Sequence, residues 1–284
     1  MSARPATRRR ARKLAFSAFV YMVLLAMAVA FLFPLLWVVG LSFKTQIQAF
    51  TIPPAWIFKP TLVNYISVLR NGDFLQAFGN SLGISTAAVL LSIAVGVPAA
   101  YSMARFPFRG RSLLFISLLL MRMLPPIAVL VPMYVLFSKL GLITTRFSVV
   151  LAYATFSLPL VVWIMRGVFE DLPREMEESA WVDGASRFAA FGQVVLPLIR
   201  PGLAATVILC LQLAWNDFLF AAVLTNNATR TLPVLMAAYA GSDTGTDWGG
   251  MTASGVLVVL PVLMFSFLAQ RHLVAGLSSG AVKG

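Results

Sequence analysis

Long runs of apolar residues, separated by short polar stretches, dominate the hydrophobic pattern of this chain. A helix needs about 20 apolar residues to cross a hydrocarbon core of about 30 Å. Six runs meet that requirement, at residues 14–43, 77–104, 112–138, 147–169, 201–224 and 249–270. Backbone groups cannot hydrogen-bond to lipid, so each run is expected to be helical. We therefore predict an all-α integral membrane protein with six transmembrane helices.

The first apolar run shares features with a secretory signal. A basic cluster at residues 8–13 precedes it, and Ala28-Val29-Ala30 looks like a cleavage site. The apolar region of a signal is short and ends at its cleavage site, whereas here it continues through residues 31–40. The pattern favours a retained first helix.

Composition and charge agree with a membrane protein. The chain is 60% hydrophobic and 11% charged, whereas soluble domains contain about 25% charged residues. Its net charge of +12 would also suit a nucleic-acid-binding protein, but the basic residues lie between the apolar runs and do not gather on one face. We therefore expect membrane lipid, and no nucleic acid, around the chain.

The distribution of Lys and Arg predicts the orientation. Of the 22 basic residues, 15 lie on the side of the N-terminal arm, six lie on the opposite side, and Arg122 lies within a span. The positive-inside rule then places both termini in the cytoplasm. We expect a basic cytoplasmic arm at 1–13, a transmembrane domain at 14–272 with a cytoplasmic loop at 170–200, and a cytoplasmic tail at 273–284.

The loop at 170–200 is unusually acidic. Six of the ten carboxylates in the chain lie between Glu170 and Asp183. Pro173 suits the first turn of a helix that Asp171 would cap. Gly184 is placed to end that helix, and Ser186 to cap a second one reaching about residue 195. The sequence predicts two short helices at an angle to each other.

Two interpretations of this loop follow from its composition. It is either a solvated segment whose acids balance nearby arginines, or a surface that contacts another protein. Apolar and small residues stand among the charges, as an interface requires: Met176, Ala180, Trp181, Phe188 and Phe191, with Ser179, Gly184 and Ala185.

A specific motif favours the second interpretation. Glu178-Ser179-Ala180, three residues, Gly184, nine residues and then Val194-Val195-Leu196-Pro197 resembles the signature loop of ABC-type importer permeases. That signature reads Glu-Ala-Ala, three residues, Gly, nine residues, Ile-any-Leu-Pro. Ser179 and Val194 depart from it by small changes, and the spacing is kept.

Two further stretches resemble the carbohydrate importers within that family. Residues 215–219, Trp-Asn-Asp-Phe-Leu, are similar to the Trp-Asn-Asp/Glu-Phe-Leu of this branch. The C-terminal stretch, which contains Gly276, Leu277, Gly280 and Lys283, resembles the Gly-Leu-Thr-x-Gly-Ala-Val-Lys-Gly end of maltose-importer-like permeases.

The resemblance implies the type I ABC importer permease fold, in a bacterial inner membrane. It implies a coupling helix between helices 4 and 5 that docks on an ATPase, through Glu178, Ser179, Ala180, Asp183, Gly184, Val194, Leu196 and Pro197. The tail would also contact the ATPases. The partners it implies are a second, homologous permease in a heterodimer, two ATPase subunits and an extracytoplasmic sugar-binding protein or lipoprotein.

The chain itself is predicted to be a non-catalytic subunit without a cofactor or metal. A phosphate-binding loop ends in Gly-Lys-Ser/Thr, whereas the only Lys followed by Ser or Thr here is Lys44, which Phe43 precedes. ATP and Mg²⁺ would therefore be bound by the partner ATPases. The expected cargo is a disaccharide such as trehalose or maltose, with amino sugars and glycerophosphodiesters as alternatives. An ion-coupled secondary transporter is a rival from another class.

Polar residues inside the predicted spans are candidates for the substrate path. A charge at mid-bilayer costs roughly 2.5–3.5 kcal/mol on insertion scales, so Arg122 and Asp217 need partners or water. They either line the path or form charge pairs that fix helix packing. Gln212, Asn216 and Asn80 would bond either sugar hydroxyls or neighbouring helices. Pro125-Pro126, next to Arg122, are expected to break the third span.

Overall fold

The computed structural model describes residues 5–240 and 247–280, and for residues 5–12, 240 and 269–280 it describes the backbone alone. Every regular element in the described residues is helical. The elements are α1 (Pro5–Ser42), α2 (Gln46–Ala49), α3 (Val63–Arg70), α4 (Gly72–Arg105), α5 (Arg111–Met123), α6 (Pro126–Lys139), α7 (Arg146–Glu170), α8 (Glu175–Val182), α9 (Arg187–Ala190), the π-helical turn η1 (Phe191–Val195), α10 (Leu196–Trp215), α11 (Leu219–Leu224), α12 (Leu232–Ala240) and α13 (Trp248–Gly280).

The predicted all-helical membrane fold is confirmed. In the described residues, five helical stretches are long and apolar enough to cross a membrane: Lys13–Ser42, Gly72–Arg105, Arg146–Glu170, Arg187–Trp215 and Trp248–Leu268. The pair α5 and α6 makes a sixth span if the two helices are counted together. Each of the six corresponds to one of the apolar runs in the sequence.

Two of the spans are interrupted. Between α5 and α6 the chain bends by 99° at Leu124 and Pro125, where a break was expected. The fifth span was predicted as one helix over residues 201–224, and this was wrong: α10 ends at Trp215 and α11 starts at Leu219. Short polar side chains that bond nearby backbone compete with a helix. Asn216 donates to Gln212 O (2.8 Å), and an Asp217 carboxylate oxygen accepts from Phe220 N–H (3.1 Å).

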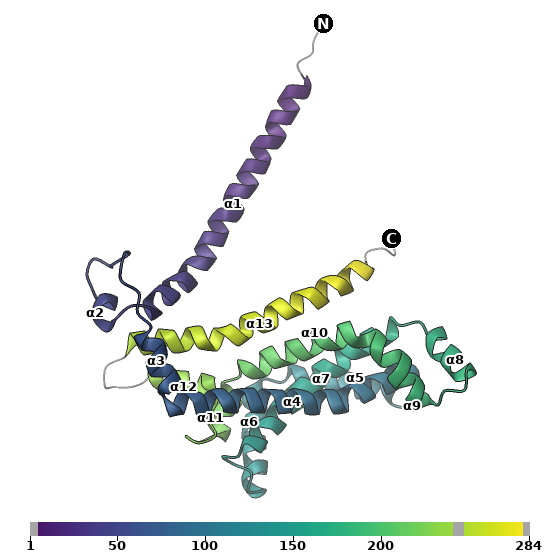
Figure 1. The fold of residues 1–284 in the computed structure, drawn as a ribbon. Coiled ribbons are helices and arrows are strands. Elements are labelled where there is room, and N and C mark those ends of the chain that lie inside the picture. The colour runs from purple at the N-terminus through teal and green to yellow at the C-terminus, as the bar shows by residue number, and fades with distance from the viewer. Residues whose placement is uncertain (1–4, 241–246, 281–284) are drawn as a thin grey trace. The chain divides into compact units, whose positions relative to one another are not determined.

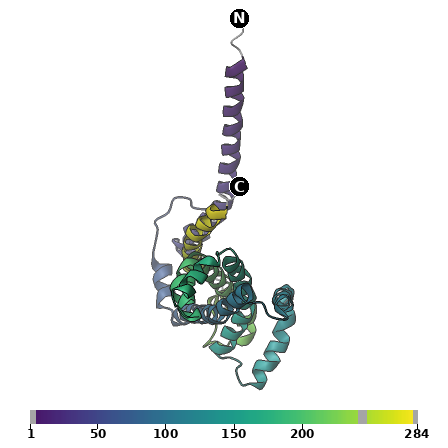
Figure 2. The same cartoon turned by 90° about the vertical axis from the view of Figure 1, so that its right-hand side faces the viewer.

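The chain divides into two compact units, Met1–Val68 with Asp243–Val256, and Leu69–Ser242 with Leu257–Gly284. The second unit is built on α4, α7 and α10, which run side by side (Figure 1) and are seen nearly end on in Figure 2. In this unit, α8 and α9 lie at one end of the helix group, and α11 and α12 lie at the other (Figure 1).

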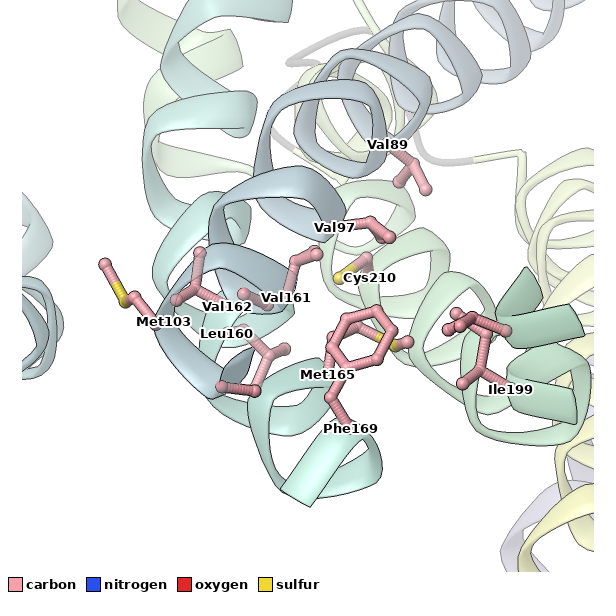
Figure 3. Packing of buried hydrophobic residues seen from close by; sticks show 13 residues of the cluster. Val89, Val97, Met103, Leu160, Val161, Val162, Met165, Phe169, Ile199 and Cys210 are labelled. Carbon is pink, nitrogen blue, oxygen red and sulfur yellow. The ribbon is translucent and has the colours of Figure 1, made fainter. Parts of the chain in front are cut away.

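Apolar side chains from all three central helices fill the core of the second unit. Figure 3 shows Val97 of α4, Val161 of α7 and Cys210 of α10 gathered in one cluster. Glycine permits close helix approach there. A Cβ on Gly96 would lie 2.7 Å from Val161 Cγ1, and one on Gly202 would lie 2.7 Å from Val168 Cγ2. These contacts fix the spacing of α7 against its two neighbours.

The first unit orders the connection that follows α1. Asn64 donates through its amide to Ser42 O and Lys44 O, both at 2.8 Å, which satisfies carbonyls at the end of the helix. Lys44 is buried; its ammonium donates to Ala55 O at 2.8 Å and lies 4.8 Å from the centre of the Phe58 ring. The segment between α1 and α3 is therefore held by its own side chains.

Candidate functional site

The first helix of the acidic loop begins later than the sequence predicts. Asp171 and Pro173 were predicted to cap and open its first helix, and this was wrong, because α7 continues through Glu170 and Asp171 forms its C-terminal cap. The Asp171 N–H donates to Gly167 O at 3.0 Å. α8 starts at Glu175, after Arg174, whose backbone carbonyl accepts from Glu177 and Glu178 N–H.

The end of α8 agrees with the sequence-based prediction. Gly184 adopts a φ of 89°, which a residue with a side chain rarely takes. Its N–H donates to Trp181 O at 3.0 Å, and Ala185 N–H donates to Ala180 O at 2.9 Å, the bonding pattern of a glycine-terminated helix. Ser186 then caps α9 by accepting from Ala189 N–H at 3.2 Å. The two short helices therefore change direction at Gly184.

The second short helix does not end near residue 195 as predicted. α9, η1 and α10 follow one another without a gap. Leu196 N–H donates to Phe191 O, five residues back, which widens the turn. Pro197 follows directly, and a proline ring clashes with the carbonyl four residues earlier in a regular helix. The wide turn thus carries the helix past the proline.

The residues expected to dock on an ATPase divide into two groups. Glu178, Ser179, Asp183 and Gly184 are exposed in the isolated chain. Ala180 is half-buried, as are Val194, Leu196 and Pro197, which lie where the loop joins α10. Exposed apolar side chains stand beside the first group, with Val182 at 88% and Phe188 at 91% exposure. An exposed surface of mixed apolar and acidic character suits contact with another protein.

Glu177 is the site residue that sequence reasoning missed. Its neighbour Glu178 is exposed, whereas Glu177 is only 2% exposed. Arg105, at the end of α4, donates through Nε to Glu177 Oε1 at 2.6 Å, and the Tyr101 hydroxyl donates to Glu177 Oε2 at 2.6 Å. No local pattern distinguishes Glu177 from the other acids of α8, because its partners lie more than 70 residues away.

The cluster formed by Glu177, Arg105 and Tyr101 joins several segments of the chain. Arg105 Nη2 donates to Leu172 O at 2.9 Å, and Arg174 Nη2 donates to Ala104 O at 3.3 Å. The Tyr101 ring lies 5.3 Å from the Phe169 ring and 4.8 Å from the Phe191 ring, centre to centre. Removing one partner of a buried ion pair typically costs about 3–5 kcal/mol, because the other charge is left uncompensated. The loop is therefore firmly attached to α4 and α7.

A cavity of about 260 Å³ lies at the two helix breaks in the second unit. Arg122 and Asp217, both predicted for the substrate path, line it. The complete lining is Arg122, Pro126, Tyr153, Phe156, Ser157, Leu213, Ala214, Asp217 and Phe220. Arg122 Nη1 donates to Phe156 O at 3.3 Å, and the Tyr153 hydroxyl donates to Asp217 O at 3.2 Å. The cavity thus combines aromatic walls with charged and hydroxyl groups.

The other three predicted path residues are outside this lining. Asn216 donates to the backbone of Gln212 within α10. Asn80 donates both amide protons to backbone carbonyls, Ala228 O and Arg230 O, each at 3.0 Å. It borders a second cavity of about 590 Å³ between α4 and α7. Of the predicted tail contacts, Lys283 lies outside the described residues, and for Gly276, Leu277 and Gly280 only the helical backbone is described.

Among the side chains that the structure describes, no three His, Cys, Asp or Glu groups gather as metal ligands would. Two candidate functional features remain in the described residues. One is the exposed loop around α8, which is fixed to the helix group, and the other is the polar cavity at the interrupted spans. Irregular backbone at membrane depth is found where it borders protein or a water-filled path. Fold and site together define an integral membrane transport subunit.

Comparison with known proteins identifies the family. A family model described as "Binding-protein-dependent transport system inner membrane component" matches residues 92–279. The chain therefore belongs to this family, and its resemblance to ABC-type importer permeases is confirmed.

Individual relatives align over almost the whole chain. The "Trehalose transport system permease protein SugB" of Mycobacterium tuberculosis is 37% identical, covering 89% of this chain and 93% of the relative. The "Trehalose/maltose transport system permease protein MalG" of Thermococcus litoralis is 34% identical, covering 91% and 94%. Among solved structures, this fold matches a chain from the "Crystal structure of a bacterial ABC transporter involved in the import of the acidic polysaccharide alginate". The TM-score is 0.78 at 22% identity, and the match covers 92% of this chain and 97% of that one. The predicted type I importer permease fold is confirmed.

Proposed function

We propose that this chain is the membrane-spanning subunit of an ATP-driven importer that carries a disaccharide such as trehalose or maltose into the cytoplasm. The observation that carries the proposal is the exposed turn of α8 at Gly184, which is anchored to α4 and keeps the spacing of the importer signature. Relatives with similar sequences over about nine-tenths of the chain are named for trehalose and for trehalose or maltose, which supports that choice of sugar.

The proposal includes partners that supply what this chain lacks. Two ATPase subunits bind ATP and Mg²⁺ and receive the exposed residues predicted to dock, which are Glu178, Ser179, Asp183 and Gly184. The tail beyond Gly276 reaches the same subunits. A second, homologous permease completes the pore, and an extracytoplasmic sugar-binding protein or lipoprotein delivers the cargo. The excess of Lys and Arg on one side supports a bacterial inner-membrane location with both termini in the cytoplasm.

The sugar path in this proposal runs past the cavity at the helix breaks. Arg122 and Asp217 offer charged hydrogen-bonding groups for sugar hydroxyls, and Phe156 and Phe220 offer apolar walls. Ligand sites in proteins usually combine apolar walls with a few polar groups in this way. Gln212 and Asn216 stay predictions for other parts of the path. For Asn80 the packing alternative is favoured, because both of its amide protons bond backbone carbonyls.

Reconstitution tests the proposal. The chain is co-expressed with a second permease, an ATPase and a sugar-binding protein encoded in the same genome, and the complex is placed in liposomes. Uptake of radiolabelled trehalose, maltose and an amino sugar is then measured. We expect disaccharide uptake that needs ATP on the ATPase side and is unaffected by a proton ionophore. Uptake driven by a proton or sodium gradient without ATP would instead identify an ion-coupled transporter. ATP-dependent uptake of only the amino sugar would correct the substrate.

A further inference from the structure

The charged side chains of α8 do not share one environment. Glu175 and Glu178 are exposed, whereas Glu177 points into the protein and is 2% exposed. A buried carboxylate is tolerated when it is paired and hydrogen-bonded. Glu177 meets that condition through two side chains of α4, Arg105 and Tyr101, each at 2.6 Å. The first turn of α8 is therefore tied to the last turn of α4 by a shielded ion pair.

The Arg105 guanidinium connects more than two segments. While Nε bonds Glu177, Nη2 donates to Leu172 O, two residues beyond the end of α7. Arg105 itself is only 7% exposed in its side chain, so water does not screen the pair. One side chain thus joins the ends of α4 and α7 to the start of α8.

A second set of contacts reinforces the same junction. Arg174, just before α8, donates back to Ala104 O of α4 at 3.3 Å. The Tyr101 ring packs edge-on against Phe169 of α7 and Phe191 of η1. Tilting α8 away from α4 would break the ion pair and the hydroxyl bond together. The junction resists bending of the loop against the spans.

We propose that Arg105 and Glu177, with Tyr101, are positioning residues that make α8 a rigid extension of α4 and α7. A displacement applied to the exposed face of the loop is then delivered to the spans and is not absorbed by bending of the loop. This inference rests on the proposed function, since it needs a partner that moves the loop. With the pair removed, the loop still docks, but ATP hydrolysis is no longer converted fully into transport.

Glu177→Gln tests the inference because glutamine keeps the shape of the side chain and removes its charge. In the reconstituted complete transporter, ATP hydrolysis and sugar uptake are measured together. We expect the ratio of ATP hydrolysed to sugar transported to rise about tenfold, within the range typical of coupling between two sites. Glu175→Gln, on the exposed face of the same helix, is the matched control and should leave the ratio unchanged. Exchanging the charges, with Arg105→Glu and Glu177→Arg together, should restore part of the coupling.

A distance measurement tests rigidity without the partners. Spin labels are attached at Val182→Cys in α8 and Val95→Cys in α4, both exposed positions, while Cys210 is buried and remains unlabelled. In lipid nanodiscs we expect a narrow distance distribution for the otherwise native chain and a broad one after Glu177→Gln. If that variant does not reach the membrane, Tyr101→Phe, which removes only the hydroxyl donor, carries the same tests.

Two outcomes overturn the inference. One is an unchanged ratio of ATP hydrolysed to sugar transported, including the case in which both rates fall in parallel. The other is an unchanged distance distribution after the pair is removed. Failure of the proposed function is recognised separately, because the native transporter would then show no ATP-dependent uptake while the spin-label comparison would still report on the junction.

Discussion

Gly96 of α4 lies directly against Val161 of α7, so close that a Cβ on the glycine would lie 2.7 Å from Val161 Cγ1. Both residues are buried in the second unit, and Val161 is fully buried. Packed helices in membranes approach closely where one of them carries a small residue. This contact sets the distance between the two helices that anchor the α8 loop.

Gly96→Ala should therefore destabilise the chain although alanine favours helices. Overpacking a tight contact typically costs about 1–3 kcal/mol, and we expect a lower thermal unfolding temperature in detergent. Gly79→Ala, on the same helix with open space around its Cβ position, is the control and should be neutral or stabilising. Equal shifts in the two variants would show that the contact with Val161 does not limit the packing.

Gly184 ends α8 in a left-handed backbone conformation. Substitutions there can test the backbone requirement and the docking surface separately. Gly184 has a φ of 89°, and apart from its chain neighbours no atom of the described residues lies within 4 Å of its Cβ position. Asparagine tolerates this conformation better than other residues with side chains. Gly184→Asn should keep the unfolding temperature within a few degrees of the native value, since the side chain meets only open space.

A bulky residue at the same position should act mainly by blocking the docking of partners. Gly184→Trp is expected to insert into the membrane and to lose ATP-driven uptake, because the indole would occupy space that a docked ATPase needs. Backbone strain of about 1–2 kcal/mol accompanies any such change, so membrane insertion and co-purification of the ATPase are measured beside uptake. Uptake at the native rate in Gly184→Trp would count strongly against docking at this turn.

Two adjacent glutamates should differ sharply in crosslinking. A photo-crosslinking amino acid in place of Glu178, which is exposed, is expected to capture an ATPase subunit in intact membranes. The same group in place of Glu177, which is buried against Arg105, should capture none, or only this chain. Failure of the Glu178 position to capture an ATPase would remove the basis for a coupling loop here.

The cavity at the helix breaks predicts a specific effect on transport. Arg122→Gln removes a charge that lines the cavity, and we expect the KM for sugar uptake to rise about tenfold, as the loss of about 1.4 kcal/mol of binding would cause. Ser117→Ala, on the same helix, is the control, because its hydroxyl bonds Leu113 O within α5. A normal KM with a lower unfolding temperature in Arg122→Gln would assign the arginine to packing.

Asn80 is expected to act through structure. Both of its amide protons are taken by backbone carbonyls of the segment between α11 and α12. Asn80→Ala would remove both hydrogen bonds, whose acceptors belong to an exposed and a half-buried residue, and each such bond typically contributes about 0.5–1.5 kcal/mol. We expect a lower unfolding temperature and an unchanged KM in transport assays. A raised KM at native stability would instead place Asn80 on the sugar path.

Local features of the sequence determined much of this protein. The lengths of the apolar runs predicted the six spans, since a helix must satisfy its own backbone in lipid. Gly184 and Ser186 predicted the end of one short helix and the start of the next, because both act on backbone within a few residues. Local chemistry also explains the break at Asn216 and Asp217, although the apolar run around them concealed it.

Only the tertiary structure decided what depends on distant parts of the chain. Glu177 and Glu178 are indistinguishable acids in sequence, yet one is buried because Arg105, 72 residues earlier, lies beneath it. In the same way, Arg122 and Asp217 border one cavity only because two interrupted spans meet there. Hydrophobic period and capping are short-range properties that the sequence displays directly. Burial and charge pairing arise from the packing of segments that are distant in sequence, so no single segment reveals them.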